Sequence, residues 1–122
     1  MWARYVFAVT FRLEPGTGVS VEPSTFETRL FHEAAEPGED GWRFFRDNLW
    51  RGEIADEDHF RSLVEAALGV TVLSVDYRAF ETDEAYLSAL RDAIAADLPS
   101  FRDESVDAVL NKYLGSSVEV RQ

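Results

Sequence analysis

The segment between Gly41 and Gly52 concentrates arginine and aromatic side chains within an acidic chain. Its candidate partner-binding residues are Trp42, Arg43, Arg46, Leu49, Trp50 and Arg51. Arginine beside aromatic residues is typical of hot spots at protein interfaces and of surfaces on which single-stranded nucleic acid stacks. The segment therefore suggests a protein partner first and RNA second. The interpretation that we favour over both is structural, with the aromatic residues in the core and the arginines paired with nearby acids.

Acidic residues surround His59 in the stretch "EIADEDH" (53–59), and their oxygens could bind a cation. However, no second histidine follows at i+4, and neither the HExxH nor the EF-hand spacing is present. Asp and Glu also belong in the first turn of a helix, where they complement the helix dipole. We therefore predict helix-terminal charges and no metal site, and keep a small metal-dependent hydrolase as an alternative function. His32 is interpreted as a structural or surface residue.

Motifs for nucleophilic catalysis and phosphate binding are missing from the sequence. There is no GxSxG, no P-loop and no glycine-rich loop ahead of a helix. The stretch "LGSS" (114–117) follows a predicted helix, so its amides lie at the wrong dipole end for a phosphate. The chain has no cysteine, which excludes disulfides and thiolate metal sites. We expect no catalytic residue and no cofactor, and hence a non-enzymatic binding module.

The charge balance points to the cellular setting. The 122 residues carry 23 Asp and Glu against 12 Lys and Arg, for a net charge of −11, and Lys112 is the only lysine. Dense carboxylates keep a chain soluble in concentrated salt, where the Debye length falls to about 3 Å near 1 M. Replacing lysine by arginine also avoids exposed methylene stems. This composition favours adaptation to high salt.

The length and the hydropathy pattern predict one globular domain in the cytoplasm. Hydrophobic residues make up 46% of the chain, enough for a packed core. The N-terminus alternates between apolar and charged residues and does not resemble a signal peptide. No apolar run approaches the length that spans a bilayer, so no membrane association is expected.

Period-two alternation predicts two N-terminal strands. Residues 2–14 alternate strictly, with Tyr5, Phe7 and Val9 on the side expected to be buried. The stretch "EPGTG" (14–18) predicts a type II turn with Pro and Gly at its centre, before a return strand over 19–33.

A short helix is predicted within residues 38–54. Trp42, Phe45 and Leu49 are spaced i, i+3, i+7 and would share its buried face, between an Asp40 N-cap and a Gly52 C-cap. "RDNLWRGE" (46–53) would be its last turn, which places Arg51 at the negative end of the dipole. We further expect Trp50 to pack in the core and Arg51 to pair with Glu53 or Asp47.

The remaining pattern predicts a helix over 56–68, a strand over 70–80 and a helix from residue 82 or 83 to Pro99. Ser100 and Asp103 would cap a last helix that ends at Gly115, before a strand over 116–120. The order is ββααβααβ. It predicts an α+β domain with a single mostly antiparallel sheet of about four strands, covered on one face by three or four helices.

Two stretches resemble a known family. "DNLWRGE" (47–53) together with "KYLGSSVEV" (112–120) is similar to the LWR-salt proteins of halophilic archaea, which are named for a Leu-Trp-Arg motif. The resemblance covers nearly the whole chain, including its acidic and cysteine-free composition. It implies a haloarchaeal cytoplasm and assigns no catalytic residue.

Overall fold

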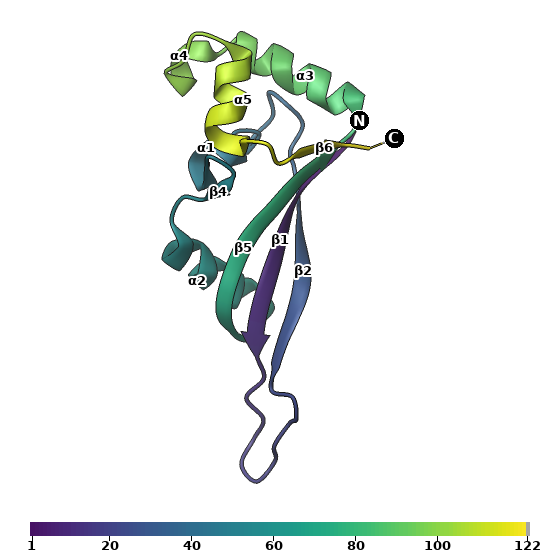
Figure 1. Cartoon of the computed structure of the whole chain (residues 1–122), viewed down its shortest axis with the longest axis vertical. Helices are drawn as coiled ribbons and strands as arrows, with labels where there is room; N and C mark the ends of the chain where they lie inside the picture. Colours follow the sequence, from purple (N-terminus) through teal and green to yellow (C-terminus); the bar gives the residue numbers. More distant parts are fainter. Residues whose placement is uncertain (122) are drawn as a thin grey trace.

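The computed structural model describes residues 1–121 and contains a four-stranded sheet (Figure 1). Its strands are β1 (Ala3–Arg12), β2 (Thr25–Glu33), β5 (Thr71–Thr82) and β6 (Val118–Val120). They lie in the order β2-β1-β5-β6, with β1 antiparallel to both neighbours and β6 parallel to β5. The predicted α+β class with a mostly antiparallel sheet is confirmed.

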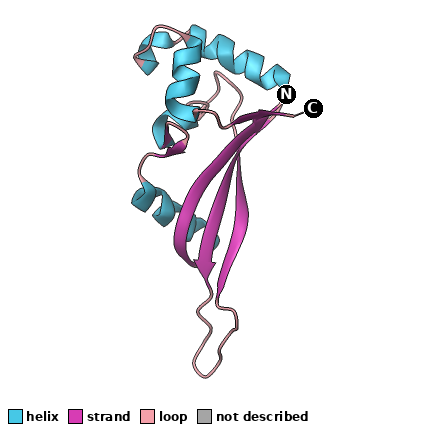
Figure 2. Ribbon diagram, in the orientation of Figure 1, coloured by secondary structure: helices cyan, strands magenta, loops and turns pink. Residues whose placement is uncertain are grey.

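Helices lie along the sheet and at the end that holds both termini, and the long β1–β2 loop projects from the opposite end (Figure 2). The helices are α1 (Phe44–Asn48), α2 (Glu57–Leu68), α3 (Glu84–Ala95), α4 (Leu98–Phe101) and α5 (Val106–Leu114). Compared with the predicted order, the chain adds the single turn α4 and a small hairpin of β3 (Leu49–Trp50) and β4 (Glu53–Ile54). Within residues 1–121, the structure contains no helix with the length and apolar character needed to cross a membrane.

The core lies between one face of the sheet and the helices. Tyr5, Phe7 and Val9 point from β1 into it and are each at most 1% exposed, as their alternation predicts. The ring of Phe44 in α1 lies 4.6 Å from that of Tyr5, and the ring of Phe60 in α2 lies 4.8 Å from that of Phe7. Aromatic pairs at such separations are stabilising beyond the area they bury. The β-strand pattern therefore places the core correctly.

The turn between the first two strands lies two residues later than predicted. The N–H of Val19 donates to the carbonyl of Gly16 at 3.2 Å, which makes Thr17 and Gly18 the central pair. Gly18 has φ 80°, the left-handed conformation that glycine adopts without steric cost. The return strand begins at Thr25, not at residue 19.

The two long helices begin as predicted, and α2 also ends as predicted, but α3 ends at Ala95 and not at Pro99, which lies within α4. Asp56 and Asp83 cap α2 and α3, and their carboxylates accept the N–H of His59 at 3.1 Å and of Tyr86 at 2.8 Å. These bonds satisfy N–H groups that have no partner within the helix. Gly69 ends α2 with φ 70°.

The cap of the last helix differs from the prediction. Ser100 lies within α4, and its hydroxyl donates to the Asp97 carboxylate at 2.7 Å. The cap of α5 is Ser105, whose hydroxyl accepts the N–H of Ala108 at 3.1 Å. The capping box of Ser100 with Asp103 is therefore wrong, because the chain forms a separate turn of helix before α5 starts.

The helix predicted over residues 38–54 is much shorter in the structure. α1 spans only five residues and begins after Arg43 without a side-chain cap, so Asp40 is not its N-cap. Leu49 leaves the helical conformation with φ −120° and ψ 153°. The face predicted from spacing is nevertheless buried, since Trp42, Phe45 and Leu49 are 5%, 0% and 1% exposed. The periodicity identified which side chains are buried but overestimated the length of the helix.

Candidate binding site at the Trp50–Arg51 hairpin

The stretch "LWRG" (49–52) forms a hairpin and not the end of a helix as predicted. The strands β3 and β4 pair antiparallel, and two residues connect them. These residues, Arg51 and Gly52, have φ of 53° and 79°. Positive φ at both central positions is the requirement of a type I′ turn, whose twist matches that of the flanking strands.

Arg51 holds a conformation that is costly for a residue with a side chain, by roughly 1–2 kcal/mol. Contacts with α5 offset this cost. The N–H of Arg51 donates to the carbonyl of Lys112 at 2.7 Å, and the N–H of Gly52 donates to that of Tyr113 at 2.9 Å. The turn is therefore fixed by a helix that lies much further along the chain.

The same two bonds complete the C-terminal cap of α5. The last four carbonyls of an α-helix have no partner within it. Here the carbonyl of Asn111 accepts the N–H of Gly115 at 3.1 Å, and that of Leu114 accepts the N–H of Ser117 at 3.1 Å. The two carbonyls between them bind the hairpin turn. Residues 47–53 and 112–120 are thus one packed unit, in which the turn of the first caps the helix of the second.

Two glycines allow this close approach. A Cβ on Gly52 would lie 3.2 Å from the carbonyl oxygen of Leu114, and one on Gly115 would lie 3.3 Å from that of Arg51. Both glycines also have positive φ, 79° and 58°. The backbones meet at a separation that a side chain would disturb.

The hairpin exposes Trp50. Side chains alternate along a strand, so the neighbour Leu49 points into the core at 1% exposed while Trp50 is 46% exposed. Its ring meets the ring of Tyr113 edge to face at 5.9 Å, and the Arg51 guanidinium lies 5.7 Å from its centroid. The prediction that Trp50 packs in the core is wrong, because a strand and not a helix carries it.

Arg51 differs from its prediction as well. Neither Glu53 nor Asp47 pairs with it, and no ion pair between residues 1–121 includes its guanidinium. Asp47 instead binds Arg46, with 3.0 Å between Oδ1 and Nε. Within residues 1–121, the exposed guanidinium of Arg51 therefore has a cation–π contact with the Trp50 ring in place of an ion pair.

The other predicted residues are divided between core and surface. Trp42 is buried, and the Arg43 guanidinium lies 4.6 Å from its ring centroid. Arg43 also donates from Nε to the Asp97 carboxylate at 2.9 Å, and this bond holds the pKa of Asp97 below its ordinary value. Arg43 is thus tied to the fold, as the structural interpretation expected. Arg46 remains at the surface beside Trp50.

Trp50 stands between two surface hollows. The first has a volume of about 390 Å³ and is lined by Arg46, Leu49, Trp50, Glu53, Ile54, Ala55 and Tyr113. The second has a volume of about 660 Å³ and is lined by Trp50, Arg51, Asp103, Ala108, Asn111, Lys112, Gly115 and Ser116. A partner that covers Trp50 would therefore find apolar and charged side chains on both sides of the ring.

Sequence reasoning missed Lys112 and Tyr113 as members of this surface. The Nζ of Lys112 donates to the carbonyl of Phe101 at 2.6 Å and lies 3.3 Å from the Asp103 carboxylate. Lys112 is thus held in place while it lines the second hollow. The signal that could have found both residues is the stretch "KYLGSSVEV", which contributed only to the family resemblance.

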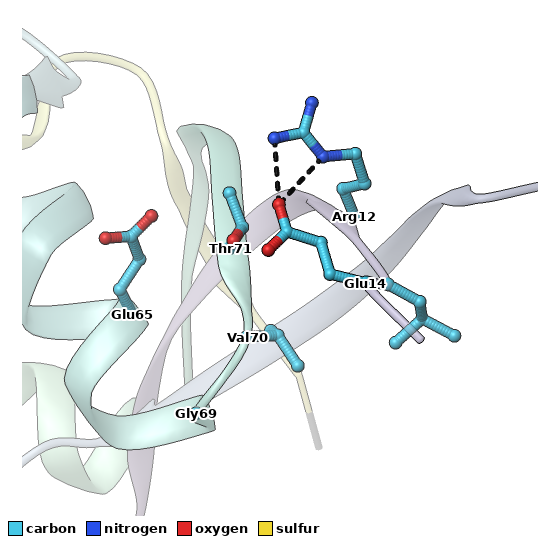
Figure 3. Close-up of a pocket in the computed structure, with 7 residues that line it drawn as sticks. Arg12, Glu14, Glu65, Gly69, Val70 and Thr71 are labelled. Carbon is cyan, nitrogen blue, oxygen red and sulfur yellow. Dashed lines mark hydrogen bonds and ion pairs between the residues drawn. The ribbon is translucent and has the colours of Figure 1, made fainter. Parts of the chain in front are cut away.

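A further hollow lies between the end of β1 and the end of α2 (Figure 3). It contains two carboxylates, and both have partners. Glu14 accepts from the Nε and Nη2 of Arg12 at 3.3 and 3.0 Å, and Glu65 accepts the N–H of Val72 at 2.9 Å. Carboxylates that already have hydrogen-bond partners are typical of structural contacts. This hollow is therefore a weaker candidate for a binding site than the hairpin.

The acids near His59 take the positions expected at a helix terminus. Asp56 is the N-cap of α2, and Glu57 and Asp58 occupy its first turn. Over residues 1–121, no group of three or more His, Cys, Asp or Glu side chains is arranged to hold a metal ion. The dipole interpretation accounts for these charges.

Comparison with known proteins identifies the family. No curated protein and no solved structure matches the chain. The sequence model of the LWR-salt proteins matches residues 1–122, and the two stretches that carried the resemblance are the ones that pack together in the structure. The chain belongs to the LWR-salt protein family.

Proposed function

We propose that the protein is a salt-adapted cytoplasmic binding module that contacts a protein partner through Trp50 and Arg51. The observation that carries this proposal is the 46% exposure of Trp50 on β3, directly before a turn whose backbone α5 holds in place. A large side chain on a fixed backbone loses little conformational freedom when it binds. Tryptophan and arginine are also the residue types that dominate interface hot spots.

The charges around Trp50 favour a protein partner over RNA. Arg46, Arg51 and Lys112 line the two hollows, but Glu53 and Asp103 line them as well. Carboxylates repel phosphate, whereas a protein surface of mixed charge can complement both signs. In concentrated salt the phosphate contribution to nucleic-acid binding also falls steeply.

The composition supports the salt-adapted part of the proposal. A net charge of −11 with a single lysine suits a cytoplasm rich in salt, where screening removes the mutual repulsion of the acids. A metal-dependent hydrolase is the remaining alternative. Metal analysis of the purified protein would test it, and the capping role of Asp56 gives it no geometric support.

The test is recovery of a partner from a lysate of the source cells kept at about 2 M KCl, where surface charges are screened. Three immobilised proteins are compared, which are the wild type, Trp50→Ala and the matched control Trp2→Ala. Trp2 is 39% exposed and lies beside Phe31 on a different surface. We expect a stoichiometric protein that the wild type and Trp2→Ala retain and Trp50→Ala loses.

Two outcomes would contradict the proposal. Recovery that is equal in all three proteins would show that Trp50 does not contact the partner. Recovery that depends on Trp50 but disappears after nuclease treatment would transfer the site to RNA. Circular dichroism of each variant at the same KCl concentration confirms that the fold is retained.

A further inference from the structure

β2 is an edge strand whose outer side has no neighbour in the described sheet (Figure 1). The bonds that flank its pairing with β1 show which backbone groups face outward. Ala34 donates to the carbonyl of Ala3 at 2.9 Å, and the carbonyl of Ser24 accepts from Leu13 at 2.9 Å. Because these groups alternate along a strand, the even-numbered residues of β2 bond to β1. The odd-numbered residues present their N–H and C=O to the free edge.

This edge lacks most of the features that usually protect one. Natural proteins block edge strands with charged side chains, above all lysine, and with proline, a bulge or a very short strand, and of these β2 has only the charges of Glu27, Arg29 and Glu33. β2 has nine residues, contains no proline or lysine, and pairs with β1 without a register shift. It also carries Phe31, which is 50% exposed. Such an edge is open to another strand.

We propose that a second copy of this chain pairs with β2 in antiparallel orientation about Thr28. In this register Glu27 lies opposite Arg29 of the second copy, and Arg29 opposite its Glu27. Both residues are exposed on the same side of the strand, and neither takes part in an ion pair within residues 1–121. On the other side of the strand, Phe26 lies opposite Leu30. Cross-strand pairs of opposite charge and of apolar residues both stabilise a sheet.

Other registers are less favourable. Since outward groups must meet outward groups, the axis can lie only at certain positions along β2. An axis at Arg29 places two arginines opposite each other, and an axis at Glu27 does the same with two glutamates. An axis at Leu30 opposes Glu27 and Glu33. An axis at Phe31 pairs Arg29 with Glu33, but it joins only residues 29–33, whereas the Thr28 axis joins residues 25–31.

Salt should strengthen this dimer. Each copy carries a net charge of −11, so two copies repel each other until the Debye length is short. High salt also strengthens the burial of apolar groups such as Phe26 and Leu30. The interface is limited to one strand from each copy, so we expect weak dimerisation, with the dimer populated only at high protein concentration. The inference does not rest on the proposed function, although a dimer would carry two Trp50 surfaces.

Charge exchange at the edge tests the register, with the mass in solution measured by sedimentation equilibrium over a wide concentration range at about 2 M KCl. The wild type should dimerise. Arg29→Glu and Glu27→Arg should each weaken dimerisation roughly threefold or more even in this salt, because two cross-strand pairs in direct contact turn from attractive to repulsive. An equimolar mixture of these two variants should form a heterodimer, since each supplies the charges that the other lacks. Arg78→Glu, the same charge change on the inner strand β5, is the control and should dimerise like the wild type.

Three results would overturn the proposal. The first is a wild type that stays monomeric at every concentration. The second is a dimer that neither edge variant weakens. The third is a dimer that Arg29→Glu and Glu33→Arg weaken but Glu27→Arg does not, which would place the axis at Phe31. The rescue in the mixture separates loss of pairing from loss of folding, because unfolded variants would not restore each other.

Discussion

Leu49 and Trp50 are adjacent and have opposite environments, which decides what each can do. Alternation along β3 turns Leu49 into the core and Trp50 outward. The Trp50 ring therefore contributes to stability only through its edge contact with Tyr113 and the nearby Arg51 guanidinium. Contacts of this kind are worth about 0.5–1.5 kcal/mol each in aromatic pairs and less at exposed cation–π sites. We propose that the main role of the exposed Trp50 ring is to contact a partner.

We predict that Trp50→Ala lowers the free energy of unfolding by about 1 kcal/mol. Trp42→Ala, in the core, should lower it by about 3–5 kcal/mol. Trp42 is the matched control, because it is the same residue type at 5% exposed in the same segment. Chemical denaturation at constant KCl measures both values. Equal losses in the two variants would mean that Trp50 is a core residue after all.

We expect His32 to make the stability of the fold depend on pH. Its ring stacks on that of Phe44 at 4.4 Å, and burial lowers the pKa of His32 below its ordinary value of about 6.5. The unfolded chain therefore binds this proton more readily than the folded chain. The stabilising effect is fully present above the unfolded pKa and is lost as the pH falls through it. We predict that the free energy of unfolding decreases between about pH 7.5 and 5.5.

The variant His32→Phe isolates this contribution, because it keeps an aromatic ring on Phe44 and cannot be protonated. Denaturation curves of the wild type and the variant should diverge as the pH falls, with the variant less sensitive. Parallel pH profiles would show that His32 does not titrate differently on folding.

At the scale of elements, the hairpin turn and α5 depend on each other. The turn supplies N–H donors to the carbonyls of Lys112 and Tyr113, and these carbonyls fix a turn that holds Arg51 at positive φ. Neither element satisfies its backbone groups alone. This mutual dependence explains physically why the stretches 47–53 and 112–120 pack as one unit.

We predict that Gly52→Ala destabilises the protein more than Gly69→Ala does. Both glycines have positive φ, 79° and 70°, so both substitutions carry the same backbone strain of roughly 1–2 kcal/mol. Only Gly52 has a backbone atom in the way, the Leu114 carbonyl oxygen at 3.2 Å from the added Cβ. The difference in unfolding free energy between the two variants measures the hairpin–α5 contact. A Gly69→Ala variant that is equally destabilised would show that this close approach is not tight.

The sequence predicted the elements whose signals are local. Alternation identified β1 and its buried face, and side-chain caps identified the starts of α2 and α3. The hairpin was missed because its causes are not local. An arginine at positive φ is no turn signal, and the donors of the turn bind a helix distant in the chain. Hence the candidate binding residues were predicted to lie within one helix with Trp50 packed in the core, while the structure buries Trp42 and exposes Trp50.

At the scale of the whole molecule, arginine and carboxylate groups form ion pairs across elements. Arg4 binds Glu81 between β1 and β5 at 2.8 Å, and Arg121 reaches the same carboxylate at 3.1 Å. Isolated surface pairs of this kind contribute little, about 0–1 kcal/mol each. The 23 carboxylates outnumber the 12 Lys and Arg side chains, so the excess negative charges repel one another. Their repulsion destabilises the fold, and salt in the solution must screen it.

Our last prediction is that added salt stabilises the fold. Raising KCl from about 0.1 M to about 2 M shortens the Debye length from about 10 Å to below 3 Å, so the repulsion within a chain of net charge −11 is screened. Exclusion of salt from apolar surface adds a smaller effect at the upper end. The melting temperature should therefore rise steeply at first and more slowly above about 1 M.

A variant with Glu36→Gln, Glu39→Gln and Asp40→Asn, all exposed in one loop, should melt higher than the wild type at low salt and respond less to KCl. A wild-type melting temperature that does not change over this range would contradict adaptation to salt, and an unchanged slope in the variant would show that net charge is not its cause.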